Sequence, residues 1–253
     1  MTFPLLPLAV LVLPALVGGT RASAAETVPS AAELRAAGVA TLTGEWKDGA
    51  RGDRIVPWRA YLPAKTDRPV PVVIVSHGLG GSRDGLGYLG EALAAHGIAT
   101  VHLQHAGSDT AVWQGKGALR IGIDMKAAMS AENATLRRGD VVFALARLTR
   151  DAAPGADTPF AGRLDTSRAG IAGHSFGAFT ALQVAGMTTG DGAVRDPRIK
   201  AALVLSPPAP PVTLPALYDG ITIPTFVFTG TADTAIGTTD AKERLKVYPK
   251  SRS

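Results

Sequence analysis

The sequence contains no cysteine. This absence excludes disulfide bonds, thiolate nucleophiles, cysteine-ligated zinc and a lipid-modified cysteine behind a leader peptide. It does not exclude export, which has to be judged from the amino-terminal residues.

The sequence also lacks a segment in which basic and aromatic residues alternate. The 26 Lys and Arg residues outnumber the 21 Asp and Glu residues, but they are scattered along the chain, and aromatic residues make up 6% of it. Surfaces that bind nucleic acids gather positive charge on one face or in one run. We therefore predict that nucleic acid is not a partner of this protein.

No hydrophobic run is long enough to cross a membrane easily. Residues 3–17 are almost wholly apolar, but this run falls short of the ~20 residues that a spanning helix needs and contains three prolines. The small residues Ala22-Ser23-Ala24 follow and fit a signal-peptidase site. We predict a signal peptide over residues 1–24, cleaved near Ala24, a secreted or periplasmic protein, and no stable membrane span. A cytoplasmic protein is the alternative, because no Lys or Arg precedes the apolar run.

Residues 25–253 have the size and hydrophobic content of one domain. The β-branched run from Val70 to Ser76 is typical of a strand buried on both faces of a mainly parallel sheet. Helical spacing over 86–96 and a strand pattern over 98–104 follow it. This alternation predicts an α/β fold in which a mostly parallel central sheet carries helices on both faces.

The same alternation continues towards the carboxyl terminus. We predict further strands over 54–62, 169–172, 199–205 and 225–229, and helices over 136–148 and 176–187. Residues 26–52 are only weakly patterned. Residues 106–133 have no clean period and are expected to form part of a lid or an exposed loop.

The chemistry is indicated first by residues 173–177, which read Gly-His-Ser-Phe-Gly between a predicted strand and a predicted helix. This placement is typical of a nucleophile elbow, in which Ser175 adopts strained backbone geometry and presents its hydroxyl at the edge of the sheet. Flanking glycines remove Cβ atoms that would collide there. A glycine-flanked helix cap is the simpler interpretation, but it does not explain a second glycine-rich motif.

That second motif, Ser76 to Ser82, reads Ser-His-Gly-Leu-Gly-Gly-Ser directly after a buried strand. It is typical of the oxyanion loop of esterases and lipases, whose glycines let backbone amides approach a bound carbonyl. By position, the amides of Leu79 and Phe176 are the predicted oxyanion donors. A phosphate-binding loop is the alternative, but the motif lacks the Lys-Ser/Thr ending and the G-x-G-x-x-G spacing of such sites.

Asp233 is the predicted acidic residue of the site. It follows the strand over 225–229 in a Gly-Thr-Ala-Asp turn, at the edge of the sheet where open α/β folds place their ligands. The order serine before acid fits this type of site. An aspartate in an ordinary surface turn is the alternative.

A histidine that would accept the Ser175 proton is missing from the expected place. None of the five histidines follows Asp233, although this fold places the base after the acid. We therefore expect the domain to be incomplete at its carboxyl end and to lack the last strand and helix. His77 and His105 could substitute because both follow strands. The simpler interpretation is that His77 shapes the oxyanion loop, and His174 is expected to pack behind the turn.

The segments VSHGLGGSRDG, AGHSFGAFTAL and FTGTAD resemble secreted dienelactone-hydrolase-like proteins and their platelet-activating-factor acetylhydrolase relatives. The resemblance covers residues 54–233 and implies an α/β-hydrolase fold. It also implies a serine ester hydrolase with Ser175 and Asp233 as catalytic residues. The elbow residue is serine rather than the cysteine of dienelactone hydrolases proper.

We therefore predict hydrolysis of a small-molecule or lipid ester through an acyl-enzyme on Ser175, with Leu79 and Phe176 stabilising the oxyanion. Neither a metal nor an organic cofactor is expected, since His102 and His105 lack the spacing of a helical metal site. Two alternatives remain open. One is an acyltransferase that uses the same acyl-enzyme, and the other is a binding protein that keeps the hydrolase scaffold without catalysis.

Overall fold

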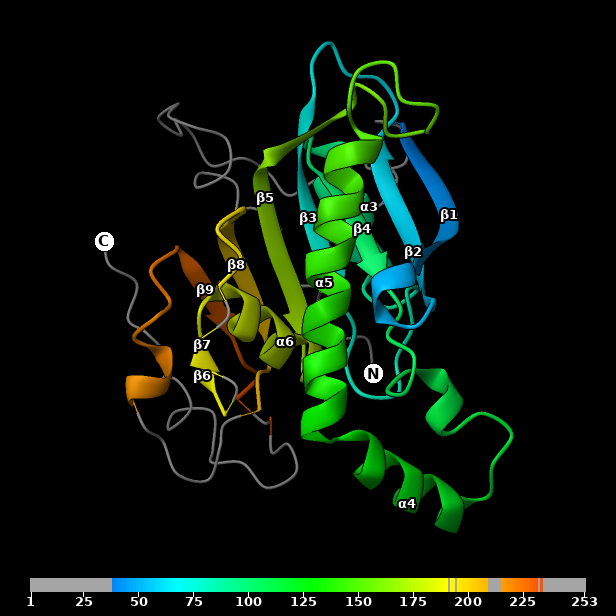
Figure 1. The fold of residues 1–253 in the computed structure, drawn as a ribbon, viewed down its shortest axis with the longest axis vertical. Coiled ribbons are helices and arrows are strands. Elements are labelled where there is room, and N and C mark those ends of the chain that lie inside the picture. Colours follow the sequence, from blue (N-terminus) through cyan, green and yellow to red (C-terminus); the bar gives the residue numbers. More distant parts are fainter. Residues whose placement is uncertain (1–37, 191, 194, 209–214, 232, 234–253) are drawn as a thin grey trace.

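The computed structural model describes residues 38–190, 192–193, 195–208, 215–231 and 233. Its centre is a seven-stranded sheet in the order β1-β2-β4-β3-β5-β8-β9 (Figure 1). The strands of this sheet are β1 (Val39–Asp48), β2 (Arg54–Pro63), β3 (Val70–Ser76), β4 (Ala99–Leu103), β5 (Leu164–His174), β8 (Ile199–Leu205) and β9 (Thr225–Phe228). The predicted signal peptide and the chain after Asp233 lie outside the described residues.

The five strands from β4 to β9 in this order run parallel to one another, whereas β1 and β2 pair antiparallel at one edge. In the parallel register, Ser76 lies opposite Gly173, His174 opposite Leu205, and Leu205 opposite Phe228. The carboxyl ends of β3, β5, β8 and β9 therefore form one continuous edge. This edge carries the loops in which the sequence motifs occur.

Helices cover both faces of the sheet, as predicted. Helix α3 (Gly87–Ala95) packs against β2 and β4, while α5 (Ala131–Asp151) and α6 (Phe176–Ala185) pack on the opposite face. In β3, Val73 and Val75 join the smaller apolar cluster with α3. Val72 and Ile74 join the larger cluster with α5 and α6. Successive side chains of a strand point to opposite faces, so this all-apolar strand supplies both cores.

The remaining elements lie outside the central sheet and the helices that cover it. Helix α4 (Ala118–Ala128) projects from one end of the molecule beside the amino-terminal end of α5 (Figure 1). The remaining elements are the 3-10 turns η1 (Gly49–Arg51), η2 (Thr110–Val112) and η3 (Pro215–Tyr218) and the short hairpin of β6 (Thr188–Thr189) and β7 (Gly192–Ala193). Within the described part of the chain, no helix combines the length and hydropathy of a membrane span.

Most predicted elements are confirmed, and β3 and β8 have the bounds expected from the sequence. Two of the longer elements were not predicted, namely strand β1 within the weakly patterned segment and helix α4 within the segment expected to be a lid or a loop. The hairpin of β6 and β7 and the 3-10 turns were not predicted either. Strand β5 and helix α5 are also longer than their apolar patterns indicated.

Candidate active site

Ser175 lies at the turn between β5 and α6. Its backbone has φ 52° and ψ −116°, and a residue with a side chain adopts a positive φ of this kind at a cost of about 1–3 kcal/mol. Its N–H donates to the Leu205 carbonyl (2.9 Å), and its carbonyl accepts from the Phe179 N–H (3.1 Å). These bonds to β8 and to the first turn of α6 hold the strained conformation, and the serine is partly exposed.

The glycines on either side of Ser175 are required by close backbone approaches. A Cβ atom on Gly173 would collide with the Gly177 carbonyl, and one on Gly177 would collide with the carbonyl of Ser76 at the end of β3. Neither neighbour is a flexible side chain that could move aside. Helix α6 can therefore begin directly after the strand only because both positions lack a side chain.

The glycine-rich loop after β3 lies against this turn. A Cβ atom on Gly78 would lie 3.5 Å from the Cβ of Ser175. The N–H groups of Leu79 and Phe176 have no hydrogen-bond partner among the described residues. For Phe176 this follows from its place as the first residue of α6, where an amide has no intrahelical acceptor. Two unpartnered amides thus lie on the two segments that meet at Ser175.

Asp233 follows β9 at the same edge of the sheet. Its N–H donates to the Gly230 carbonyl (3.1 Å), and its carboxylate accepts from the Thr229 hydroxyl (3.2 Å). Partial desolvation of the ring lowers the pKa of His174, and the negative charge of Asp233 offsets part of this effect. The structure therefore brings Asp233 into the electrostatic neighbourhood of the elbow, while its catalytic role stays a prediction.

None of the five histidines forms a hydrogen bond with the Ser175 hydroxyl in the described structure. His77 and His105 are 4% and 0% exposed, and both ring nitrogens of each are engaged in other hydrogen bonds. The expectation that His174 packs behind the turn is wrong, because this side chain is exposed.

A buried cluster of charged and polar side chains lies behind the glycine-rich loop. The Asp140 carboxylate, which is 0% exposed, accepts hydrogen bonds from Arg54 Nε (2.7 Å) and His105 Nδ1 (2.9 Å) and pairs with Arg51. The Nε2 atom of His105 lies 2.9 Å from the Ser76 hydroxyl. This Ser-His-Asp chain resembles a triad in residue type, but Ser76 is fully buried and inaccessible to a substrate.

The pKa values in this cluster are displaced by burial and by the ion pairs. Burial disfavours the charged form of Asp140, but hydrogen bonds from His105 and Arg54 outweigh burial and hold its pKa well below the ordinary value. Burial and the charge of Arg137 lower the pKa of His105 to about 4. Asp140 is therefore ionised and His105 is neutral near pH 7.

Arg137 and Asp140, both fully buried on α5, were not among the predicted site residues. The sequence did contain a pattern that could have indicated them. They lie at helical spacing from Val141, Ala144 and Leu148 on the inward face of the helix. Charged residues on the apolar face of an amphipathic helix are the mark of a buried polar network.

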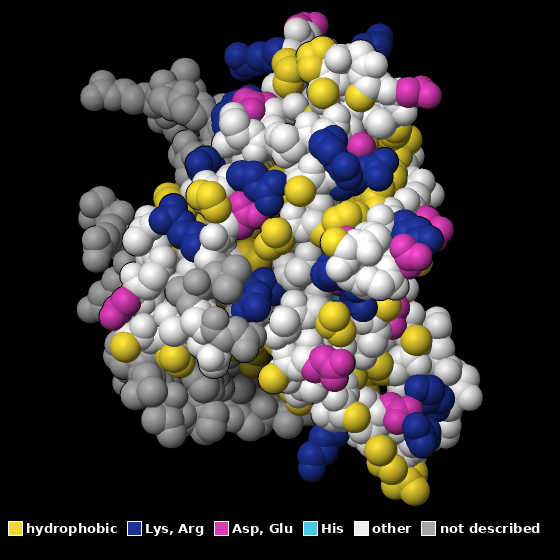
Figure 2. All heavy atoms as spheres, viewed as in Figure 1, with side chains coloured by type: hydrophobic (Ala, Val, Ile, Leu, Met, Phe, Trp, Pro, Cys, Tyr) yellow, Lys and Arg dark blue, Asp and Glu magenta, His cyan; other side chains and the backbone are white. Residues whose placement is uncertain are grey.

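The segment between β4 and α5 covers the outer side of the loop. Trp113 Nε1 donates to the Gly80 carbonyl (2.7 Å), and a Cβ atom on Gly80 would lie within 3.2 Å of the Met125 sulfur. Beyond this contact, Leu119 and Ile123 of α4 are 82% and 56% exposed. Figure 2 shows hydrophobic side chains gathered at the end of the molecule where α4 projects.

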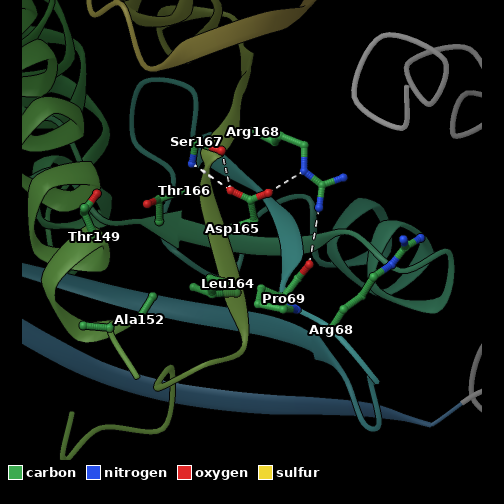
Figure 3. Close-up of a pocket in the computed structure, with 10 residues that line it drawn as sticks. Arg68, Pro69, Thr149, Ala152, Leu164, Asp165, Thr166, Ser167 and Arg168 are labelled. Atoms are coloured by element: carbon green, nitrogen blue, oxygen red, sulfur yellow. Dashed lines mark hydrogen bonds and ion pairs between the residues drawn. The ribbon is translucent and has the colours of Figure 1, made fainter. Parts of the chain in front are cut away.

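An open pocket of ≈ 480 Å³ lies at the other edge of the sheet, where β5 begins (Figure 3). Within it, the Asp165 carboxylate accepts from Ser167 and from Arg168 Nε, and Arg168 also donates to the Pro69 carbonyl. Ser175 follows the far end of the same strand. The pocket is therefore remote from the elbow, and its Asp165 carboxylate is already occupied by Ser167 and Arg168.

Among the described residues, no group of three or more His, Asp or Glu side chains is arranged to hold a metal ion. The Asp140 carboxylate is already bound by Arg51, Arg54 and His105, and Asp233 lies on a separate loop.

Comparison with known proteins places this geometry in context. The platelet-activating factor acetylhydrolase, isoform II, family matches residues 48–132, which include the glycine-rich loop but not the elbow. A ferulic acid esterase from Streptomyces cinnamoneus has a similar structure, with a TM-score of 0.59 and 22% sequence identity over 85% of this chain and 72% of that chain. A comparison with curated proteins found no significant match. The predicted resemblance to the acetylhydrolases is thus confirmed over the matched residues, and the fold is that of the α/β-hydrolases.

Proposed function

We propose that this α/β-hydrolase-fold protein cleaves carboxylic esters through an acyl-enzyme on Ser175. The serine oxygen attacks the ester carbonyl carbon and loses its proton to a base. The alcohol leaves with a proton, and water then releases the acid. The amides of Leu79 and Phe176 donate to the oxyanion of each tetrahedral intermediate, and Asp233 is the acidic residue of the site.

One observation carries the proposal. A serine in strained geometry lies at the start of a helix whose first amide, that of Phe176, has no hydrogen-bond partner among the described residues. The same serine lies against Gly78, and the amide of the following residue, Leu79, also has no partner there. Such amides, aimed at the place where negative charge develops, are commonly the largest single contribution to acyl transfer. The matched acetylhydrolase family and the structural likeness to a ferulic acid esterase support the same class of reaction.

A small-molecule or lipid ester is the proposed substrate class. The family description names an acetylhydrolase and the structural neighbour is an esterase, so both point to acyl groups bound through oxygen. We also propose that residues 1–24 direct the protein to the periplasm or the exterior and that residues 25–253 form the hydrolase domain.

A binding protein without catalysis is the second candidate. It is favoured because none of the five histidines, all of which the structure describes, hydrogen-bonds to the Ser175 hydroxyl. A serine hydroxyl of ordinary pKa is a poor nucleophile without a base. An oxyanion hole alone still leaves about 10³- to 10⁴-fold acceleration over water after removal of triad residues. Turnover in plain buffer therefore does not distinguish the two candidates.

The decisive experiment measures covalent modification. A fluorophosphonate should add one phosphonyl group to Ser175, detected by intact and peptide mass spectrometry, and Ser175→Ala should abolish this adduct. Imidazole added as an external base should raise turnover of p-nitrophenyl acetate by the wild type at least about 10-fold above the background of Ser175→Ala.

Ser167→Ala is the matched control, because Ser167 lies near the opposite end of β5 and hydrogen-bonds to Asp165. This variant should label and respond to imidazole like the wild type. Equal labelling or equal turnover of the wild type and Ser175→Ala would exclude the hydrolase and leave the binding protein.

A further inference from the structure

The backbone of the glycine-rich loop is held from several sides. The Gly80 N–H donates to the Ser108 carbonyl (2.9 Å), and the Gly80 carbonyl accepts from Trp113. The His77 carbonyl accepts from the Arg137 guanidinium. Between these fixed points, the Leu79 N–H faces no acceptor among the described residues. The loop therefore holds this amide ready for an external acceptor.

The direction of that amide is set one bond away, at the Gly78 carbonyl. This carbonyl accepts from His77 Nδ1 (2.6 Å) and from the Gly81 N–H (3.1 Å). The described peptide bonds are trans, and in a planar trans peptide the C=O and the following N–H point in opposite directions. Fixing the Gly78 carbonyl towards the His77 ring therefore aims the Leu79 N–H away from that ring.

The tautomer of His77 follows from its second contact. The His105 backbone N–H donates to His77 Nε2 (3.1 Å), so Nε2 carries no proton and Nδ1 is the donor. Burial lowers the pKa of His77 well below its ordinary value, and the positive charge of Arg137 and the neighbouring His105 ring add to this effect. The ring is therefore neutral near pH 7, and the tautomer that holds Gly78 is the one present.

Arg137 connects the glycine-rich loop to helix α6. Its guanidinium, which is 0% exposed, donates to the His77 carbonyl and to the hydroxyls of Ser76 (3.1 Å) and Thr180 (3.2 Å). It also lies 4.6 Å from the centre of the Phe176 ring. One buried cation thus contacts the loop that carries the Leu79 amide and the helix that carries the Phe176 amide.

We propose that His77 is a positioning residue of the oxyanion hole, whose imidazole holds the Gly78 carbonyl so that the Leu79 N–H points to the oxyanion. This inference rests on the proposed ester hydrolysis at Ser175. His77 acts only through the peptide it holds, because its ring is buried and both nitrogens are used within the protein.

Three substitutions of His77 separate donor geometry from packing. His77→Asn keeps an N–H near the position of Nδ1 and can still hold the Gly78 carbonyl. His77→Gln reaches towards the His105 amide but leaves that carbonyl without its side-chain donor. His77→Leu removes both contacts at similar volume. The full chain carries each substitution, with Ser175→Ala alongside.

The measurements are the rate of Ser175 phosphonylation, kcat and KM for p-nitrophenyl acetate with imidazole, and the thermal midpoint. Removing an oxyanion donor commonly costs about 10²- to 10³-fold in kcat. A misdirected donor should cost about 10- to 100-fold in kcat and in phosphonylation rate for His77→Leu and His77→Gln. KM should change little, and His77→Asn should recover most of the rate.

The outcomes are distinct. Rates that follow the thermal midpoint in all three variants, with no recovery in His77→Asn, would show a structural role only and overturn the inference. Unchanged rates in His77→Leu would also overturn it, while normal labelling of Ser175 in the wild type leaves the ester hydrolase standing. A wild type that labels no better than Ser175→Ala removes both proposals.

Discussion

The two sides of the glycine-rich loop differ sharply. Behind it, Asp140, His105 and Arg137 are 0% exposed and joined by hydrogen bonds. In front of it, Ser175 is partly exposed, His174 is exposed, and α4 turns apolar side chains to the surface. The charged groups of this cluster are therefore withdrawn from solvent, whereas the serine on the other side of the loop can be reached from it.

This contrast shows how a site can be both open and exact in its geometry. Amides that must meet an oxyanion need a fixed direction, and in the interior a hydrogen bond is stronger and less easily exchanged for water. A substrate needs access, which the front side provides. The buried network thus supplies the rigidity that an exposed loop lacks, and three predictions test this division.

The largest effect is expected from breaking the buried side. Asp140→Asn leaves Arg51, Arg54 and His105 without their shared anion, and removing one partner of a buried ion pair costs about 3–5 kcal/mol. Urea denaturation at pH 7 should show this loss of unfolding free energy. Asp84→Asn is the control, since Asp84 is 58% exposed in its pair with Arg59 and should change stability little. Equal losses in the two variants would contradict a special role for the interior.

Acid should also destabilise the interior, through the buried His102 on β4. Burial lowers the pKa of His102 to about 4 from an ordinary value of 6.5. Between pH 6.5 and 4, this histidine is therefore protonated in the unfolded chain but not in the folded one. The free energy of unfolding has its full value above this window and falls as the pH drops through it. One such histidine contributes up to about 3 kcal/mol.

Denaturation midpoints measured from pH 7.5 to 4 check this prediction. His102→Asn keeps a donor for the Gly85 carbonyl but cannot be protonated, so its stability should fall less steeply with acid. The same slope in the variant and the wild type would assign the acid sensitivity to other groups.

The smallest effect is expected on the exposed helix α4. Gly122 lies inside this helix, and a Cβ atom added there would meet no other atom within 4 Å. Gly→Ala in a helix interior stabilises by about 0.5–1 kcal/mol, so Gly122→Ala should raise the denaturation midpoint. Gly97→Ala is the matched control, because it has equal space but a φ of +80° and should lower the midpoint. A fall in both variants would show that α4 is not helical in solution.

Elements with a strong local pattern were predictable, whereas the longer elements β1 and α4, which lack one, were not. Strand β1 places Leu42, Gly44 and Trp46 on one side, but the pattern is broken at Gly44, where a Cβ atom would meet the ring of Trp58. In α4 only Ala128 is buried. A helix that packs against so little has no apolar stripe for a sequence to reveal.

Some residues of the candidate site were likewise predictable from local patterns, and others were not. The two glycine motifs marked Ser175, Leu79 and Phe176, because glycine placement reflects local backbone geometry. Arg137 and Asp140 were missed because their partners lie far away in the sequence. The Arg137 guanidinium contacts Ser76 across 61 positions, and Asp140 contacts Arg54 across 86.

The amino-acid sequence by itself determined the order of strands and helices and the tight turn at Ser175, since both depend on neighbouring residues. Only the tertiary structure decided which histidines are buried and neutral and which polar groups meet behind the loop. Burial and hydrogen-bond partners arise when distant segments pack together, and no local pattern encodes the desolvation that results.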